Sequence, residues 1–258
     1  MDSRLALLYF IKRYEVDKGI RMNNNLRLSN RLEKIASFIA EGTTFADIGS
    51  DHAYLPCYVC LHDRNAQAIA GEVRKGPFQR AQKTVSHFGL SNQVDVRLGD
   101  GLQVLQDCEV ASVIIAGMGG SLIKTILDEG SDRLGSVEQI IAQPNIDEQS
   151  VRQWLIRHGF TIADETMVEE NGYIYEIVIG SNQGGIQELT EKQLLFGPYL
   201  LKQKPELFYQ KWKHEHDKRA RTLEQMKKAS VPDDKKITAF TNELTWIEEV
   251  LSDDNGYA

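Results

Sequence analysis

Short apolar runs alternate with segments of helical pattern from residue 44 to residue 158, and this alternation limits the possible folds more than any other feature of the chain. The apolar runs predict five strands, at Thr44–Ile48, Ala66–Ala70, Val94–Leu98, Ala111–Ala116 and Gln139–Ala142. Helices are predicted around them at Leu28–Phe38, Ala53–Leu61, Pro77–Phe88, Ser121–Glu129 and Glu148–His158. Strands joined through helices form parallel sheets with helices on both faces, so an α/β protein is predicted.

Two further strands are predicted near Phe160–Thr166 and Tyr173–Ile179, and a turn rather than a helix connects them. The turn is Glu169-Glu170-Asn171-Gly172. So short a connection reverses the chain, and the last strand can therefore run antiparallel to the others. The sequence predicts a seven-stranded sheet with an antiparallel last strand.

The pattern changes after Gly184-Gly185, where two helical segments replace the alternation of strands and helices. The first is predicted over residues 189–229 with a break at Gly197-Pro198, and the second over residues 234–251. Apolar residues of the second segment follow a 3-4-3-4 spacing, at Ile237, Phe240, Leu244, Ile247 and Leu251. This spacing predicts a coiled-coil hairpin. We divide the chain into a sheet domain (22–185), a helical domain (186–258) and an N-terminal extension (1–21) ahead of Met22, which resembles a natural start.

Composition and charge exclude several classes of protein. Three cysteines are too few for a disulfide framework, so a cytoplasmic location is expected. No apolar stretch approaches the ~20 residues of a membrane-spanning helix, and no membrane partner is expected. The net charge is −7, yet residues 202–228 hold nine Lys and Arg against four Asp and Glu. A basic segment on an acidic protein is typical of an arm that binds an anion.

Acidic residues lie at the ends of three successive predicted strands, namely Asp47, Glu72 and Asp100. Strand ends in such a sheet face the ligand crevice, and Gly49 allows a ligand to approach the backbone closely. Carboxylates can accept hydrogen bonds from ribose hydroxyls, an adenine amino group and an ammonium, but they repel a pyrophosphate. S-adenosylmethionine therefore fits better than NAD, whose Gly-x-Gly-x-x-Gly loop is also missing. The alternative is that these are ordinary surface acids that cap helices.

Three glycines follow the fourth predicted strand, in Gly117-Met118-Gly119-Gly120. They keep side chains away from the place where a methyl acceptor would meet a sulfonium, so a flat base could approach. A tight strand-to-helix turn with positive φ is the alternative explanation, and the two can hold together.

Five strings of residues occur together in this chain: Leu28-Ser29-x-Arg31-Leu32, Asp47-Ile48-Gly49-Ser50-Asp51-His52-Ala53-Tyr54-Leu55-Pro56, Ala70-Gly71-Glu72, Ala116-Gly117-Met118-Gly119-Gly120 and Gln143-Pro144-Asn145. They resemble the bacterial tRNA (adenine-22-N1)-methyltransferases. The resemblance runs from about residue 22 to residue 179 and continues in outline through the C-terminal helices. The second string is long enough to be specific, and residues 1–21 lie outside the family pattern.

The resemblance implies a Rossmann-like class I methyltransferase domain, S-adenosylmethionine as the cofactor, tRNA as the partner and a C-terminal coiled coil that helps to hold it. The reaction implied is methyl transfer to N1 of adenine 22. The cofactor-binding residues expected are Arg31, Asp47, Gly49, Ser50, Asp51, Glu72, Val73, Asp100, Gly101, Gly117 and Met118. The substrate-binding residues expected are Gly119, Gly120, Pro144, Asn145, Lys211, Lys213, Arg219 and Arg221. No metal and no protein partner are expected, and the chain is expected to be a monomer or a weak dimer.

The turn that follows the first predicted strand supplies the candidate catalytic residues Asp51, His52 and Tyr54. Asp51 would offer a charge to the methylated base, and Tyr54 would stack on the base or bond to it. His52 could instead cap the following helix.

Three further alternatives stay open at this point. The basic segment could be a solvated helix face that pairs with Glu215, Asp217 and Glu224. Cys57 and Cys60 form a Cys-x-x-Cys that is better explained as buried packing than as a metal or redox site. The chain could also methylate another RNA or a small molecule, bind RNA without catalysis, or act as a dehydrogenase.

Overall fold

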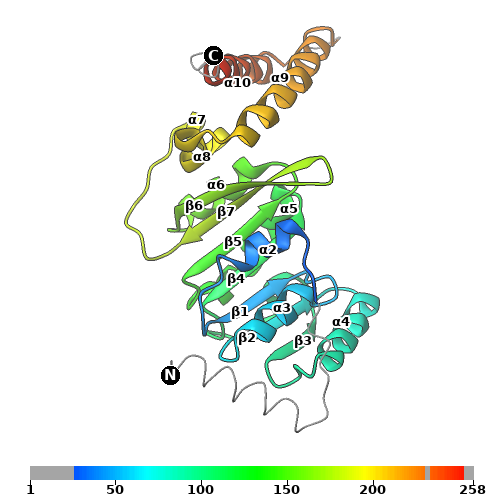
Figure 1. Ribbon diagram of the computed structural model, residues 1–258. Coiled ribbons are helices and arrows are strands. Elements are labelled where there is room, and N and C mark those ends of the chain that lie inside the picture. The colour runs from blue at the N-terminus through cyan, green and yellow to red at the C-terminus, as the bar shows by residue number, and fades with distance from the viewer. Residues whose placement is uncertain (1–25, 230–232, 253–258) are drawn as a thin grey trace, which may run out of the picture.

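The computed structural model describes residues 26–229 and 233–252 (Figure 1). The predicted extension and the proposed start at Met22 lie outside these residues. Among the described residues, seven strands form one sheet in the order β3-β2-β1-β4-β5-β7-β6. Their bounds are β1 Thr44–Ile48, β2 Gln67–Glu72, β3 Val94–Leu98, β4 Ser112–Met118, β5 Gln139–Pro144, β6 Thr161–Glu170 and β7 Tyr173–Ser181.

Strand direction in the sheet agrees with the sequence prediction. The strands from β3 to β5 pair in parallel, whereas β7 runs antiparallel to both β5 and β6. The order of the strands reverses between β1 and β4, and ligands of such sheets bind at this switch point, beyond the carboxyl ends of the strands.

Helices of the described residues cover both faces of the sheet (Figure 1). Their bounds are α2 Asn30–Ala36, α3 Tyr54–His62, α4 Lys75–His87, α5 Gly120–Glu129 and α6 Glu148–Arg157. Apolar residues of α2, α3 and α4 share one buried cluster with Phe45 and Ile114, while those of α5 and α6 share another with Ile48 and Ile115. Successive strand residues thus enter opposite cores, as a sheet buried on both faces requires. Two short 3₁₀ helices, Gly101–Val104 and Ser131–Leu134, were not predicted.

The C-terminal helices lie beside the β6–β7 end of the sheet (Figure 1). They are α7 Glu191–Phe196, α8 Pro198–Gln203, α9 Glu206–Lys227 and α10 Asp234–Ser252. The predicted break at Gly197-Pro198 is present, and a second break follows at Lys204-Pro205, where Lys204 has φ of 43°. Phe196, Phe208 and Trp212 pack with Ile247 of α10 and Met167 of β6 in a third core.

The structure confirms that the two long helices pack against each other, since α9 and α10 are in contact. Of the apolar residues predicted to form a seam, Leu244 and Ile247 are buried, whereas Ile237, Phe240 and Leu251 are partly exposed. The coiled coil and the domain boundaries stay predictions. No helix of the described residues combines the length and the apolar character needed to cross a membrane.

Candidate cofactor and base site

The turn after β1 has an unusual backbone. Gly49 has φ of 74°, and Asp51, His52 and Ala53 have φ of 43°, 79° and 58°. The left-handed conformation costs a non-glycine residue roughly 1–2 kcal/mol, so three in a row mark a constrained segment of the kind found at functional sites. Its shape is fixed in part by Glu72, whose Oε1 accepts a hydrogen bond of 3.3 Å from the backbone N–H of His52.

Two buried carboxyl groups lie at the ends of β1 and β2. Asp47 and Glu72 are each 5% exposed, and Ser50 Oγ donates a 2.5 Å hydrogen bond to Asp47. Burial, with a smaller contribution from the nearby charge of Glu72, raises the pKa of Asp47 to about 7. Burial also raises the pKa of Glu72. In the described part of the chain neither carboxyl group forms an ion pair with Lys or Arg. A cationic ligand with hydroxyl groups would therefore supply partners that the protein lacks.

The remaining predicted cofactor residues lie at the same edge of the sheet. Val73, directly after β2, is 59% exposed, and Asp100 is exposed two residues beyond the end of β3. Gly101 has φ of 50°, and a Cβ there would lie 3.1 Å from the Ile126 side chain, so this position is tightly packed against α5. Their contacts with a cofactor stay predictions.

An amide cluster joins the ends of β4 and β5 to α2. Gln143 is fully buried, and its Oε1 accepts hydrogen bonds from Gly117 N at 3.0 Å and Arg31 Nη1 at 2.6 Å. Its Nε2 donates to Asn145 Oδ1 at 3.2 Å, and Asn145 Nδ2 donates to the Gly117 carbonyl at 2.8 Å. The guanidinium of Arg31 also lies over the Tyr175 ring, 4.8 Å from its centroid. The structure thus unites the predicted residues Arg31, Gly117 and Asn145 through Gln143, which belongs to the Gln143-Pro144-Asn145 string but is not among the predicted site residues.

The glycines after β4 differ in their roles. A Cβ on Gly120 would lie 1.9 Å from the carbonyl oxygen of Asp147, so this position requires glycine for packing. Gly117 has φ of 76°, which agrees with the tight-turn explanation. At Gly119 the nearest atom to an added Cβ is 3.8 Å away, an ordinary van der Waals contact, so packing does not require glycine here. Met118 lies over Gly49, since a Cβ at Gly49 would be 2.3 Å from Met118 Cε.

Of the candidate catalytic residues around the turn after β1, Asp51 and Tyr54 are exposed and His52 is half-buried. The side chain of Asp51 is 86% exposed, and one of its oxygens lies 3.1 Å from His52 Nδ1. The rings of His52 and Tyr54 are 5.6 Å apart. The N-cap residue of α3 is Ala53, and no side chain caps the helix, so the alternative role of His52 as a cap is wrong. Arg80 of α4, which the sequence did not single out, lies 3.4 Å from His52 Nε2.

The β6–β7 hairpin brings further aromatic side chains to this edge. Strand β5 pairs with β7 only from residue 178 to residue 181, so the rest of the hairpin extends past β5 on the side where the parallel strands end. Tyr173, beside the turn, is 68% exposed and lies 6.4 Å from the Tyr175 ring. An exposed aromatic ring beside a base site suits stacking. Tyr173 is not among the site residues predicted from the sequence.

The basic segment requires one correction. Lys211 was expected to contact substrate, but its side chain is only 12% exposed and its Nζ pairs with Glu148 at 2.6 Å and Glu176 at 2.7 Å. It faces the interior because carboxylates of α6 and β7 attract it there. Arg219 pairs with Glu215 and Glu243, which supports the solvated-face alternative at that residue.

Other residues of the basic segment stay available to solvent. Lys213 and Arg221 are exposed, and their phosphate contacts stay predictions.

Cys57 and Cys60 are both buried, and burial raises the pKa of each thiol to about 12, which agrees with a packing role. Within the described ranges no group of three or more His, Cys, Asp or Glu could hold a metal ion.

Comparison with known proteins gives consistent matches along most of the chain. A family model described as tRNA (adenine(22)-N(1))-methyltransferase matches residues 45–249. A Bacillus subtilis (strain 168) protein of that name is 38% identical over 234 residues, which are 88% of this chain and 98% of the relative. The solved B. subtilis m1A22 tRNA methyltransferase has a TM-score of 0.82 at 37% identity, covering 88% of this chain and 100% of its own. A Streptococcus pneumoniae protein solved in complex with S-adenosyl-L-methionine has a TM-score of 0.77 at 40% identity, covering 87% and 100%.

Proposed function

This chain belongs to the tRNA (adenine(22)-N(1))-methyltransferase family, and we propose that it transfers a methyl group from S-adenosylmethionine to N1 of adenine 22 of a tRNA. The product would be 1-methyladenosine. Such an enzyme is expected to work in the cytoplasm on tRNA.

The buried carboxyl groups at the ends of β1 and β2 support this cofactor. Asp47 would hold the ammonium of the cofactor, Glu72 the ribose hydroxyls, and Asp100 the adenine amino group. The absence of a Lys or Arg partner for Asp47 and Glu72 in the described residues fits a ligand that is cationic and carries no phosphate. When bound, S-adenosylmethionine supplies a methyl group on a positively charged sulfur.

The acceptor base would lie between the first turn and the amide cluster. Adenine N1 has an in-plane lone pair and no proton to lose, so the protein must align the base rather than deprotonate it. The missing side chain at Gly119 and the fixed amide of Asn145 suit a planar ring with an amino group at its edge. Methylation makes the adenine ring cationic, and the exposed carboxylate of Asp51 would stabilise that charge.

Access to N1 places a condition on the RNA. In a Watson–Crick pair N1 is blocked, so the target base must be unpaired or turned out of its stack. Tyr173 on the projecting hairpin would then stack on a base of the substrate, and Lys213 and Arg221 of α9 would contact phosphates.

The observation that carries the proposal is that two buried carboxyl groups without a Lys or Arg partner in the described residues lie at the same edge of the sheet as Gly119 and Asn145, in a chain of this family. The test is incubation with tRNA and labelled S-adenosylmethionine, followed by mass-spectrometric mapping of the methyl group. Label at N1 of adenine 22 supports the proposal. Label at another atom or in another RNA refutes the assignment of the substrate, and tRNA binding without label indicates an RNA-binding module that lacks catalysis. Calorimetry with S-adenosylhomocysteine and with NAD separates the methyltransferase from a dehydrogenase.

A further inference from the structure

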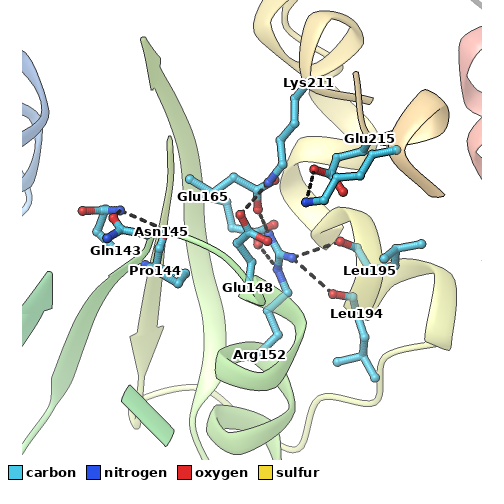
Figure 2. A network of polar contacts seen from close by, with 12 residues as sticks. Gln143, Pro144, Asn145, Glu148, Arg152, Glu165, Leu194, Leu195, Lys211 and Glu215 are labelled. Carbon is cyan, nitrogen blue, oxygen red and sulfur yellow. Dashed lines mark hydrogen bonds and ion pairs between the residues drawn. The ribbon is translucent and has the colours of Figure 1, made fainter. Parts of the chain in front are cut away.

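A buried network of charged side chains connects the sheet domain to the C-terminal helices (Figure 2). Arg152 of α6 is fully buried and pairs with Glu165 of β6 at 2.6 Å and with Glu176 of β7. Glu176 and Glu148 both bind Nζ of Lys211, which comes from α9. The network thus contains two cations and three carboxylates drawn from four elements of the fold.

Backbone groups of the helical part complete this network. Nη1 of Arg152 donates to the carbonyl oxygens of Leu194 and Leu195, at 3.2 Å each. The other oxygen of Glu165 accepts a 2.9 Å hydrogen bond from the N–H of Tyr199. A Cβ on Gly197 would lie 2.5 Å from the Glu165 carboxylate, so the chain between α7 and α8 packs directly against the charges. The helical part is therefore held by directional bonds as well as by apolar contact.

The charge balance indicates which groups are ionised. Burial alone would favour the neutral form of Glu148, but the charge of Lys211 outweighs burial and lowers the pKa of Glu148. Likewise the two carboxylates around Lys211 outweigh its burial and raise the pKa of the ammonium. Burial raises the pKa of Glu165, and the nearby charge of Glu176 also raises it. Lys211 and Glu148 thus face each other as a charged pair.

The network continues into the acceptor loop, which we define as residues 143–147, from the last two residues of β5 to the residue before α6. Glu148 is the first residue of α6 and follows Asn145 by three positions, as Figure 2 shows. The segment between them is fixed at both sides: Asn145 N–H donates to the Met118 carbonyl at 2.7 Å, and the Ile146 carbonyl accepts from Gly120 N–H at 2.8 Å. Because only two residues separate Glu148 from Asn145, a displacement of Glu148 would strain the hydrogen bonds that hold Asn145.

From this continuity we infer that Lys211 is a positioning residue, which fixes the acceptor loop relative to α9 through its ion pair with Glu148. The inference rests on the proposed function, because it concerns the alignment of the target base. A buried ion pair adds little to stability when compared with an apolar pair of similar shape, but it fixes orientation through directional hydrogen bonds. A tRNA bound to the C-terminal helices is thereby aligned with the loop that carries Asn145.

The test uses the full chain and compares Glu148→Gln and the double variant Lys211→Met/Glu148→Gln with the unchanged protein. We expect kcat for tRNA methylation to fall at least about tenfold, since small misplacements of reacting groups cost that much. The Kd for S-adenosylhomocysteine and the Kd for tRNA should stay within about twofold. Lys192→Met is the matched control, because Lys192 forms an exposed pair with Glu249 between α7 and α10, and it should leave all three quantities unchanged.

Amide hydrogen exchange supplies a readout that does not depend on activity. In Glu148→Gln, exchange over residues 143–149 should accelerate, while exchange in β1 and β4 should not change. Unchanged kcat in both variants overturns the inference. A fall in kcat accompanied by loss of S-adenosylhomocysteine binding, or by faster exchange throughout the sheet, overturns it too, since it shows a merely structural role. If the double variant does not fold, Glu148→Gln alone decides. If the protein without substitutions does not methylate tRNA, the proposed function is refuted. The exchange result then still tests whether the pair of Lys211 and Glu148 fixes residues 143–147.

Discussion

Acidification is expected to weaken cofactor binding through the carboxyl group of Asp47. Its burial raises the pKa to about 7, so near pH 6 most of this carboxyl is neutral in the free protein. A neutral acid cannot balance the ammonium of the cofactor. If only the ionised form binds, about one tenth of the protein is competent at pH 6, and the apparent Kd for S-adenosylhomocysteine should be about tenfold higher there than at pH 8.

The raised pKa of Asp47 also changes how the stability of the free protein depends on pH. The unfolded chain has the usual pKa of 3.8 for Asp47, so between about pH 4 and pH 7 folding takes up a proton. The free energy of unfolding contributed by this group is therefore highest at low pH and falls as pH rises through that window. The difference between the two pKa values corresponds to about 4 kcal/mol.

Isothermal titration calorimetry with S-adenosylhomocysteine tests the binding part of this argument. Titrations at pH 6, 7 and 8, each in two buffers with different ionisation enthalpies, give both Kd and the number of protons released. We expect release of nearly one proton per bound ligand at pH 6 and almost none at pH 8. Asp47→Asn should bind more weakly and lose most of the pH dependence, whereas Asp100→Asn should keep it, because Asp100 is exposed.

Two results would refute the reasoning about Asp47. One is a Kd that changes by less than about twofold between pH 6 and pH 8. The other is an Asp47→Asn variant that keeps the full pH dependence, which would assign the titration to another group such as Glu72, whose pKa burial also raises.

Gly120→Ala is expected to lower the free energy of unfolding by about 3 kcal/mol in a urea titration, because its Cβ would lie 1.9 Å from the Asp147 carbonyl oxygen. Gly135→Ala, which meets open space, is the control, and an equal effect of both substitutions would contradict the packing argument. Asp51→Asn should lower kcat of methylation by about tenfold while the cofactor still binds, and an unchanged kcat would exclude the electrostatic role. Tyr173→Ala should weaken tRNA binding by about 1 kcal/mol in a filter-binding assay, and Tyr173→Phe should not, since stacking requires only the ring.

Much of the sheet could be predicted because hydrophobic burial shows directly in the sequence. Strands β1 and β3 have the predicted bounds, and each ends on an apolar residue, Ile48 and Leu98. Strand β5 extends two residues past its predicted end, because Gln143 and Pro144 are buried without being part of an apolar run. Short 3₁₀ helices and the break at Lys204-Pro205 depend on packing around them, and periodicity does not report them.

The candidate site was predictable where a residue's role follows from its place in the topology. Asp47 and Glu72 occupy strand ends, and parallel strands bring their ends together. The amide cluster was harder to predict, because Arg31 and Gln143 are 112 positions apart and meet only when α2 packs against β6. Tyr173 could have been found from the exposed turn next to it, given the direction of the last strand.

The sequence alone determined the strand–helix alternation, the antiparallel last strand, the acidic strand ends and the family resemblance, because each is a local pattern. The tertiary structure alone decided which charges face the solvent. Lys211 and Lys213 lie two positions apart in the same basic segment, yet Lys211 is buried between Glu148 and Glu176 while Lys213 is exposed. A charged side chain can be buried only where opposite charges lie close to it. For Lys211 these are Glu176 and Glu148, which lie 35 and 63 positions away in the sequence.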